Sequence, residues 1–208
     1  MNILHISASP RGAQAASRAL SNHVVERLLA RHPGASITVR ELAGGEDGAD
    51  DTALPHIDAG YALALSSAAN EPGVDGAQLR SDGLIEELVR ADIVVIGTPM
   101  HNLTVPSTLK SWIDHVVRIN RTMRPTPEGK VGNLHDRPVY LALASGGIRT
   151  GERARQPDFL EPYLRAILAM IGLKNVTVFS AEGLALGAER AAEGQARAWT
   201  AVERYFGA

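Results

Sequence analysis

Short apolar runs alternate with helical patterns along the chain, and this alternation restricts the possible folds more than any other feature. The run Ile93-Val94-Val95-Ile96 is the clearest, because four consecutive β-branched residues favour a strand over a helix. Similar runs occupy residues 3–6, 37–42, 139–144 and 175–181. Strands that are apolar on both faces predict a parallel sheet covered by helices on both sides. We therefore expect an α/β fold with a five-stranded parallel sheet.

Helical spacing of apolar residues fills the stretches between these runs. The sequence predicts helices over residues 17–32, 76–90, 109–117, 159–171 and 188–206, with a shorter one over 58–67. The acidic, glycine-rich segment 44–51 is typical of an exposed loop. Residues 120–136 are expected to be irregular, and a segment of this length is more typical of a functional loop than of a plain connector. Without repeats or a linker-like stretch, residues 1–208 are predicted to form a single domain.

Composition excludes several classes of function. The 21 basic and 23 acidic residues leave a formal charge of −2, which does not favour binding to nucleic acid or to an anionic membrane. The absence of cysteine excludes disulfides, thiolate metal sites and a cysteine nucleophile, and it favours a cytoplasmic location. We expect no membrane span, no signal peptide and no metal site, because the seven histidines lack metal-ligand spacing.

The loop between the first strand and the first helix contains a candidate phosphate site. Ser9, Arg11, Gly12 and Ser17 surround the predicted start of the helix, where free backbone N–H groups and hydroxyls bind anions. Neither a dinucleotide nor an NTP-binding glycine motif is present. The alternative is that Ser17 merely caps the helix, and this loop alone does not decide between the two interpretations.

Two further loops follow strands at the same predicted edge of the sheet. Met100 in the loop 98–103 offers a soft side chain for a flat ring, although it would equally fill a gap in the core, and His101 would equally be an exposed loop residue. The Gly146-Gly147 pair allows close approach of a ligand, although such pairs also form ordinary turns. Because ligands bind at the carboxyl ends of strands in such sheets, the three loops together predict a planar, phosphorylated ligand.

The blocks that carry these loops resemble the FMN-dependent NADH:quinone oxidoreductase and azobenzene reductase family. The blocks are Ser9-Pro10-Arg11-Gly12 with Ser17-Arg18, Pro99-Met100-x-Asn102 followed by Val105-Pro106-x-x-Leu109-Lys110, Ser145-Gly146-Gly147 and Ala181-Glu182-Gly183. The resemblance implies a flavodoxin-like three-layer sandwich, a homodimer, and FMN as cofactor. It implies that the FMN phosphate contacts Ser9, Ala15, Ala16 and Ser17, that the ring lies along Met100, His101, Asn102 and Leu103, and that its polar edge meets Ser145, Gly146 and Gly147.

Some positions depart from the family pattern. Ala15 stands where a second serine is usual, and His101 and Leu103 stand where tyrosine and phenylalanine are usual. The resemblance implies ping-pong transfer of electrons from NAD(P)H to quinones or azo compounds, without an assigned catalytic acid or base. Two alternatives are a flavodoxin-like electron carrier, which the small net charge disfavours, and a binding module that has lost FMN.

Overall fold

A five-stranded parallel sheet forms the centre of the molecule. The computed structural model describes residues 1–44, 53–66 and 76–207, so most of the expected loop 44–51 lies outside the described residues. The strands run in the order β2-β1-β3-β6-β7, and every neighbouring pair is parallel. Their bounds are β1 Asn2–Ser7, β2 Ser36–Glu41, β3 Ile93–Pro99, β6 Val139–Ala144 and β7 Val176–Ala181. The order reverses between β1 and β3, which is where such sheets place their ligands.

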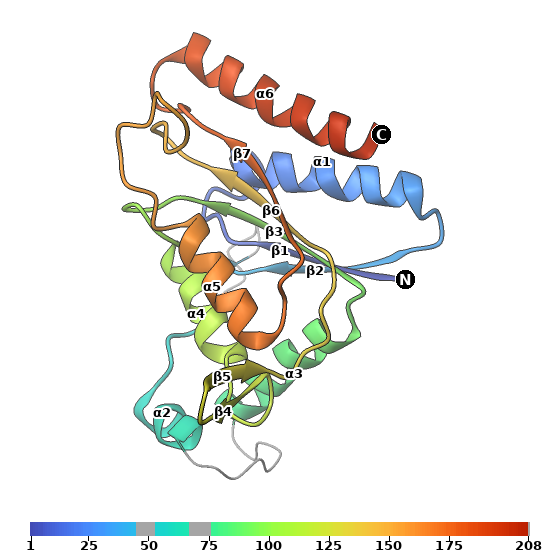
Figure 1. The fold of residues 1–208 in the computed structure, drawn as a ribbon, viewed down its shortest axis with the longest axis vertical. Coiled ribbons are helices and arrows are strands. Elements are labelled where there is room, and N and C mark those ends of the chain that lie inside the picture. Colours follow the sequence, from blue (N-terminus) through green and yellow to red (C-terminus); the bar gives the residue numbers. More distant parts are fainter. Residues whose placement is uncertain (45–52, 67–75, 208) are drawn as a thin grey trace.

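Helices cover both faces of the sheet (Figure 1). One face carries α1 (Ala16–Arg31) and α6 (Ala188–Gly207), and the opposite face carries α3 (Gly76–Arg90), α4 (Ser107–Val116) and α5 (Glu161–Ile171). The short helix α2 (Ala59–Ser66) lies beyond α4 and α3. The predicted three-layer α/β sandwich is thus confirmed. Among the described residues, no helix is both long and apolar enough to span a bilayer.

The two layers of core follow from the alternation of side chains along each strand. In β3, Val94 and Ile96 join the cluster beneath α3, α4 and α5, whereas Ile93 and Val95 join the cluster beneath α1 and α6. Trp112 is almost fully buried in the first cluster. The strand β2 departs from the expectation of burial on both faces. It is an edge strand, and 54% of Val39 remains exposed.

The segment predicted to be irregular contains an antiparallel hairpin. Its strands are β4 (Met123–Thr126) and β5 (Gly129–Gly132). The hairpin packs against the end of α5, where a Cβ added to Gly132 would lie 2.1 Å from the backbone nitrogen of Gly172. Short strands that contain proline and glycine lack the alternating apolar pattern on which the prediction depended. The prediction for residues 120–136 was therefore wrong in its secondary structure.

Candidate functional site

The first turn of α1 has unsatisfied polar groups beside a cavity. The helix begins at Ala16, so Ala15 occupies the N-cap position, and no side chain caps the helix. Ser17, which would cap the helix in the simpler interpretation, lies inside the first turn, and its buried hydroxyl has no hydrogen-bond partner among the described residues. A buried polar group without a partner costs about 1–3 kcal/mol. An anion at this helix N-terminus would satisfy both the hydroxyl and the free N–H groups.

The cavity itself has a volume of about 220 Å³ and lies at the carboxyl edge of the sheet. Its lining comes from the four loops that follow β1, β3, β6 and β7: Ser9, Arg11, Ala15, Ala16, Ser17, Pro99, Met100, His101, Ala144, Ser145, Gly146, Leu184 and Ala185. Eight of the eleven predicted site residues are among them, while Asn102, Leu103 and Gly147 are not. Within the part of the chain that the structure describes, the lining contains Arg11 but no carboxylate, so its chemistry suits a ligand that carries negative charge.

Met100 is fixed at the cavity by contacts on both sides. Its backbone N–H donates to Ala144 at 2.7 Å, which continues the pairing of β3 with β6. Its sulfur accepts a hydrogen bond from Nε2 of Gln156 at 3.1 Å. Met100 is only partly buried against the core, so part of its soft side chain is available to the cavity. These contacts hold one wall of the cavity in place.

A tight turn follows, with two residues in the left-handed region. His101 and Thr104 exchange backbone hydrogen bonds of 2.9 and 3.0 Å around Asn102 and Leu103. The φ angles of Asn102 and Leu103 are 47° and 71°. Asparagine tolerates this conformation, whereas a leucine pays about 1–2 kcal/mol for it. Strain of this kind often accompanies a functional site.

The glycine pair is packed from behind by the loop between β7 and α6. The N–H groups of Gly183, Leu184 and Ala185 donate to the carbonyls of Gly147, Ser145 and Gly146, at 3.2, 3.1 and 3.0 Å. A Cβ at Gly147 would lie 2.4 Å from Oε1 of Gln156. A side chain at position 147 would therefore displace the amide of Gln156, while Gly146 lines the cavity.

Comparison with known proteins places this chain in a family. Residues 1–205 match the model of a family described as having a flavodoxin-like fold. An FMN-dependent NADH:quinone oxidoreductase 5 of Burkholderia lata is 47% identical over 184 residues, covering 88% of this chain and 86% of the relative. A second relative, FMN-dependent NADH:quinone oxidoreductase 4 of Pseudomonas fluorescens, is 44% identical over 99% of this chain and 96% of its own. The chain belongs to this flavodoxin-like family of FMN-dependent NADH:quinone oxidoreductases.

Solved structures agree with the fold of this family. An azoreductase from Bacillus anthracis superimposes with a TM-score of 0.83 at 23% identity, over 99% of this chain and 98% of that one. An FMN-dependent NADH-azoreductase from the same species, solved in complex with FMN, gives a TM-score of 0.78 at 23% identity, over 99% and 97% of the two chains. At this identity the likeness supports the fold alone.

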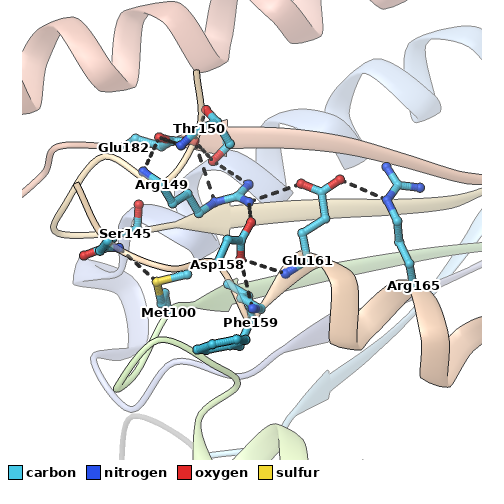
Figure 2. A network of polar contacts seen from close by, with 12 residues as sticks. Met100, Ser145, Arg149, Thr150, Asp158, Phe159, Glu161, Arg165 and Glu182 are labelled. Atoms are coloured by element: carbon cyan, nitrogen blue, oxygen red, sulfur yellow. Dashed lines mark hydrogen bonds and ion pairs between the residues drawn. The ribbon is translucent and has the colours of Figure 1, made fainter. Parts of the chain in front are cut away.

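A buried arginine behind the glycine turn was missed by the sequence analysis. Figure 2 shows Arg149 reaching between Asp158, Glu161 and Glu182: its guanidinium pairs with Asp158, contacts Glu161 at 3.2 Å, and donates to Ser180 at 3.0 Å. The backbone N–H of Arg149 donates to Glu182 at 2.9 Å. This network joins the loop after β6 to β7 and α5, and so fixes the wall that carries Gly146.

Two lining residues, and one residue that supports the lining, also escaped prediction. Leu184 and Ala185 are small or apolar residues in a loop without a recognisable motif, and Gln156 is a single amide eleven positions after Ser145. The partners of Arg149 are likewise scattered over residues 158–182. Within the part of the chain that the structure describes, no three His, Cys, Asp or Glu side chains gather as metal ligands would.

Proposed function

We propose that this chain is a flavoenzyme that binds FMN in the cavity and reduces quinones or azo compounds with NAD(P)H. The observation that carries the proposal is the buried, unpartnered hydroxyl of Ser17 at the uncapped start of α1. A phosphate group supplies the acceptors that these donors lack. The family supports FMN as the source of that phosphate, because the curated relatives are named FMN-dependent.

The remaining walls of the cavity suit a flat, polar ring. Met100 offers its thioether and His101 its imidazole, and Asn102 and Leu103 form the turn just beyond them. Ser145 and Gly146 bring backbone to the cavity from the next strand, and Gly147 holds Gln156 behind them. We assign the phosphate end to Ser9, Ala15, Ala16 and Ser17 and the ring end to these residues. No cysteine is present for covalent attachment, so we propose noncovalent binding.

FMN, when bound, supplies a group that accepts two electrons from one substrate and gives them to another. The protein's residues bind and orient it, and they leave room for each substrate in turn. The overall reaction balances as NAD(P)H, one proton and a quinone giving NAD(P)⁺ and the hydroquinone. Among the described residues the lining offers no carboxylate as a general acid or base, so the proton that the overall reaction consumes comes from solvent or from exposed His101.

The electron-carrier alternative has less support. The relatives at 44–47% identity are named as oxidoreductases of NADH and quinones, and the net charge of −2 provides no strongly acidic face for docking to a protein partner. A module without FMN would also leave the Ser17 hydroxyl unsatisfied in its working state. The cavity thus argues against the module without FMN, whereas the names of the relatives and the charge argue against the carrier.

One preparation of the protein tests the proposal. Acid precipitation of the purified protein should release its flavin entirely as FMN, and NADH oxidation should become fast and stoichiometric when menadione is added. Ser17→Ala should lower the FMN content, whereas Ser111→Ala, which removes a buried hydroxyl on α4 away from the cavity, should not. FAD in the supernatant, or a flavin that reduces no acceptor, would refute the proposal.

We further propose that residues 1–208 form one domain and that two copies form a homodimer in the cytoplasm. The dimer follows from the family resemblance, and the β4–β5 hairpin that projects beside α5 offers a surface for it (Figure 1). Light scattering should report twice the mass of 22.1 kDa at micromolar concentration. A fully active monomer would contradict the dimer without affecting the proposed reaction.

A further inference from the structure

A second and larger cavity adjoins the first. It has a volume of about 560 Å³ and lies between the loop after β6, the end of β7 and α6, along the helix from Arg190 to Ala201. The loop between β7 and α6 is its common wall with the first cavity, because Gly183 and Leu186 line the second, whereas Leu184 and Ala185 line the first. The two cavities are therefore separated by a single stretch of chain.

The second cavity combines positive charge with an apolar floor. Arg153, Arg190 and Arg197 line it together with Ile148 and Leu186. Arg190 and Arg197 approach Glu193 at 4.0 and 3.7 Å, with 52% and 60% of their side chains exposed. Exposed ion pairs at these N–O distances contribute little to stability, so both guanidinium groups remain able to bind an anion.

The carboxylates of the cavity do not cancel this preference. Glu152 and Glu182 also line it, against three arginines, and Glu152 is exposed to solvent. The oxygens of Glu182 accept from the backbone of Arg149 and Thr150 at 2.9 and 3.2 Å and from the Thr150 hydroxyl at 2.8 Å. Those donors draw the carboxylate inward, into the network of Figure 2. A ligand with phosphates beside the arginines and a flat, less polar group on the floor fits this arrangement.

The position of the cavity matters as much as its charge. The order β1-β3-β6-β7 places β7 next to the Ser145–Gly146 wall, at the end of the first cavity assigned to the ring. A third cavity of about 410 Å³ lies at the opposite, phosphate end, beside Pro10, Arg11 and Ala43, and Arg11 is the one charged residue of its lining among those that the structure describes. A substrate whose reacting group must meet the ring would extend into the cavity at the ring end.

We propose that the second cavity binds the adenosine and diphosphate part of NAD(P)H while the nicotinamide enters the first cavity. The inference rests on the proposed function, which requires a dinucleotide as hydride donor. Arg153, Arg190 and Arg197 bind the phosphates, and Ile148 and Leu186 contact the adenine. These arginines act on binding of the donor and take no part in the transfer itself.

The test compares NADH with N-methyl-dihydronicotinamide, which donates hydride but lacks the adenosine diphosphate. In the FMN-loaded double variant Arg190→Gln/Arg197→Gln, the KM for NADH should rise at least about tenfold, the factor that corresponds to about 1.4 kcal/mol. The kcat and the rate with N-methyl-dihydronicotinamide should stay within about twofold of the original. Arg153→Gln should give a smaller change of the same kind, and Arg204→Gln, near the far end of α6, should give none.

Binding of ADP-ribose to the FMN-loaded protein gives a readout without turnover. Calorimetry should show binding to the original protein and at least about tenfold weaker binding to the double variant. An unchanged KM for NADH, or an equal loss with both donors, overturns the inference, as does a rise in KM confined to Arg11→Gln, which would assign the nucleotide to the third cavity. If the original protein oxidises no NADH in the presence of menadione, the proposed function itself fails.

Discussion

At the scale of single residues, His5 makes the stability of the folded protein depend on pH. It lies in β1 beneath α1, where its Nε2 is 2.8 Å from the hydroxyl of Ser21. That hydroxyl donates to the carbonyl of Arg18, so His5 is the donor in the pair. Burial, together with the charge of Arg18, lowers the pKa of His5 from 6.5 to about 4. The folded protein thus keeps this histidine neutral at pH values where the unfolded chain protonates it.

The stability of the protein should therefore fall as the pH drops from about 6.5 to about 4, because the unfolded chain binds the extra proton over this range. The loss attributable to His5 approaches 3 kcal/mol, at about 1.4 kcal/mol for each unit of pKa shift. Urea unfolding at several pH values should show this slope, and His5→Gln should flatten it. His135→Gln, at an exposed position, should leave it unchanged. An equal slope in the His5 variant would place the acid sensitivity elsewhere.

Ala15 allows a direct test of how α1 begins. It is buried and extended at the N-cap position, where serine would accept a hydrogen bond from the first turn. Ala15→Ser should stabilise the FMN-free protein by about 1 kcal/mol in urea unfolding. The same change at exposed Ala13, in the short turn before the helix, should have little effect. If the free energy of unfolding does not rise in the Ala15 variant, the first N–H groups of α1 already have partners.

The sequence could predict which loops lie together at the site, but not which contacts each residue makes there. Ser9, Met100 and Gly146 line the cavity because they directly follow strands whose ends share one edge. The alternative that Ser17 caps the helix was wrong and Gly147 does not line the cavity, because the exact start of a helix and the packing behind a turn depend on atoms far along the chain. Arg149 gave no sequence signal, since its carboxylate partners form no spaced motif.

At the scale of elements, a glycine can allow a helix to pack closely against its neighbours, and two helical glycines differ in this respect. A Cβ at Gly194 in α6 would lie 2.1 Å from the carbonyl oxygen of Glu182, whereas one at Gly83 in α3 would meet nothing within 4 Å. Gly194→Ala should therefore destabilise the protein by roughly 2 kcal/mol or more, through overpacking. Gly83→Ala should stabilise it by about 0.5–1 kcal/mol, through helix propensity. Thermal unfolding of the two variants should give shifts of opposite sign, and a shift in the same direction would contradict this packing.

Long elements were predicted well and short ones poorly, for a physical reason. The strand β3 and the helices α1, α3 and α6 carry enough periodic apolar residues to reveal which face is buried. The strands β4 and β5 have four residues each and owe their pairing to one another and to the end of α5. Such pairing depends on tertiary contacts, which local patterns do not encode.

At the scale of the whole molecule, the strand order was not deduced from the alternating pattern alone. That pattern predicts a parallel sheet with its loops at one edge, whereas the order β2-β1-β3-β6-β7 brings the four strands whose ends line the cavity side by side. Both substrates must reach the ring face beside Met100 and His101, and two flat groups cannot stack on one face at the same time. Initial rates at varied NADH and menadione should therefore give parallel double-reciprocal lines. Intersecting lines would show that both substrates bind together.

The central claim is that the start of α1 recognises the phosphate of FMN, and the affinities of FMN and riboflavin test it most directly. Titration of the FMN-free protein, followed by flavin fluorescence, should give at least about 100-fold tighter binding of FMN, corresponding to about 2.8 kcal/mol. Ser17→Ala should reduce this preference about tenfold and leave riboflavin binding unchanged. Equal affinity for the two flavins, or an equal loss of both in the Ser17 variant, would contradict the account.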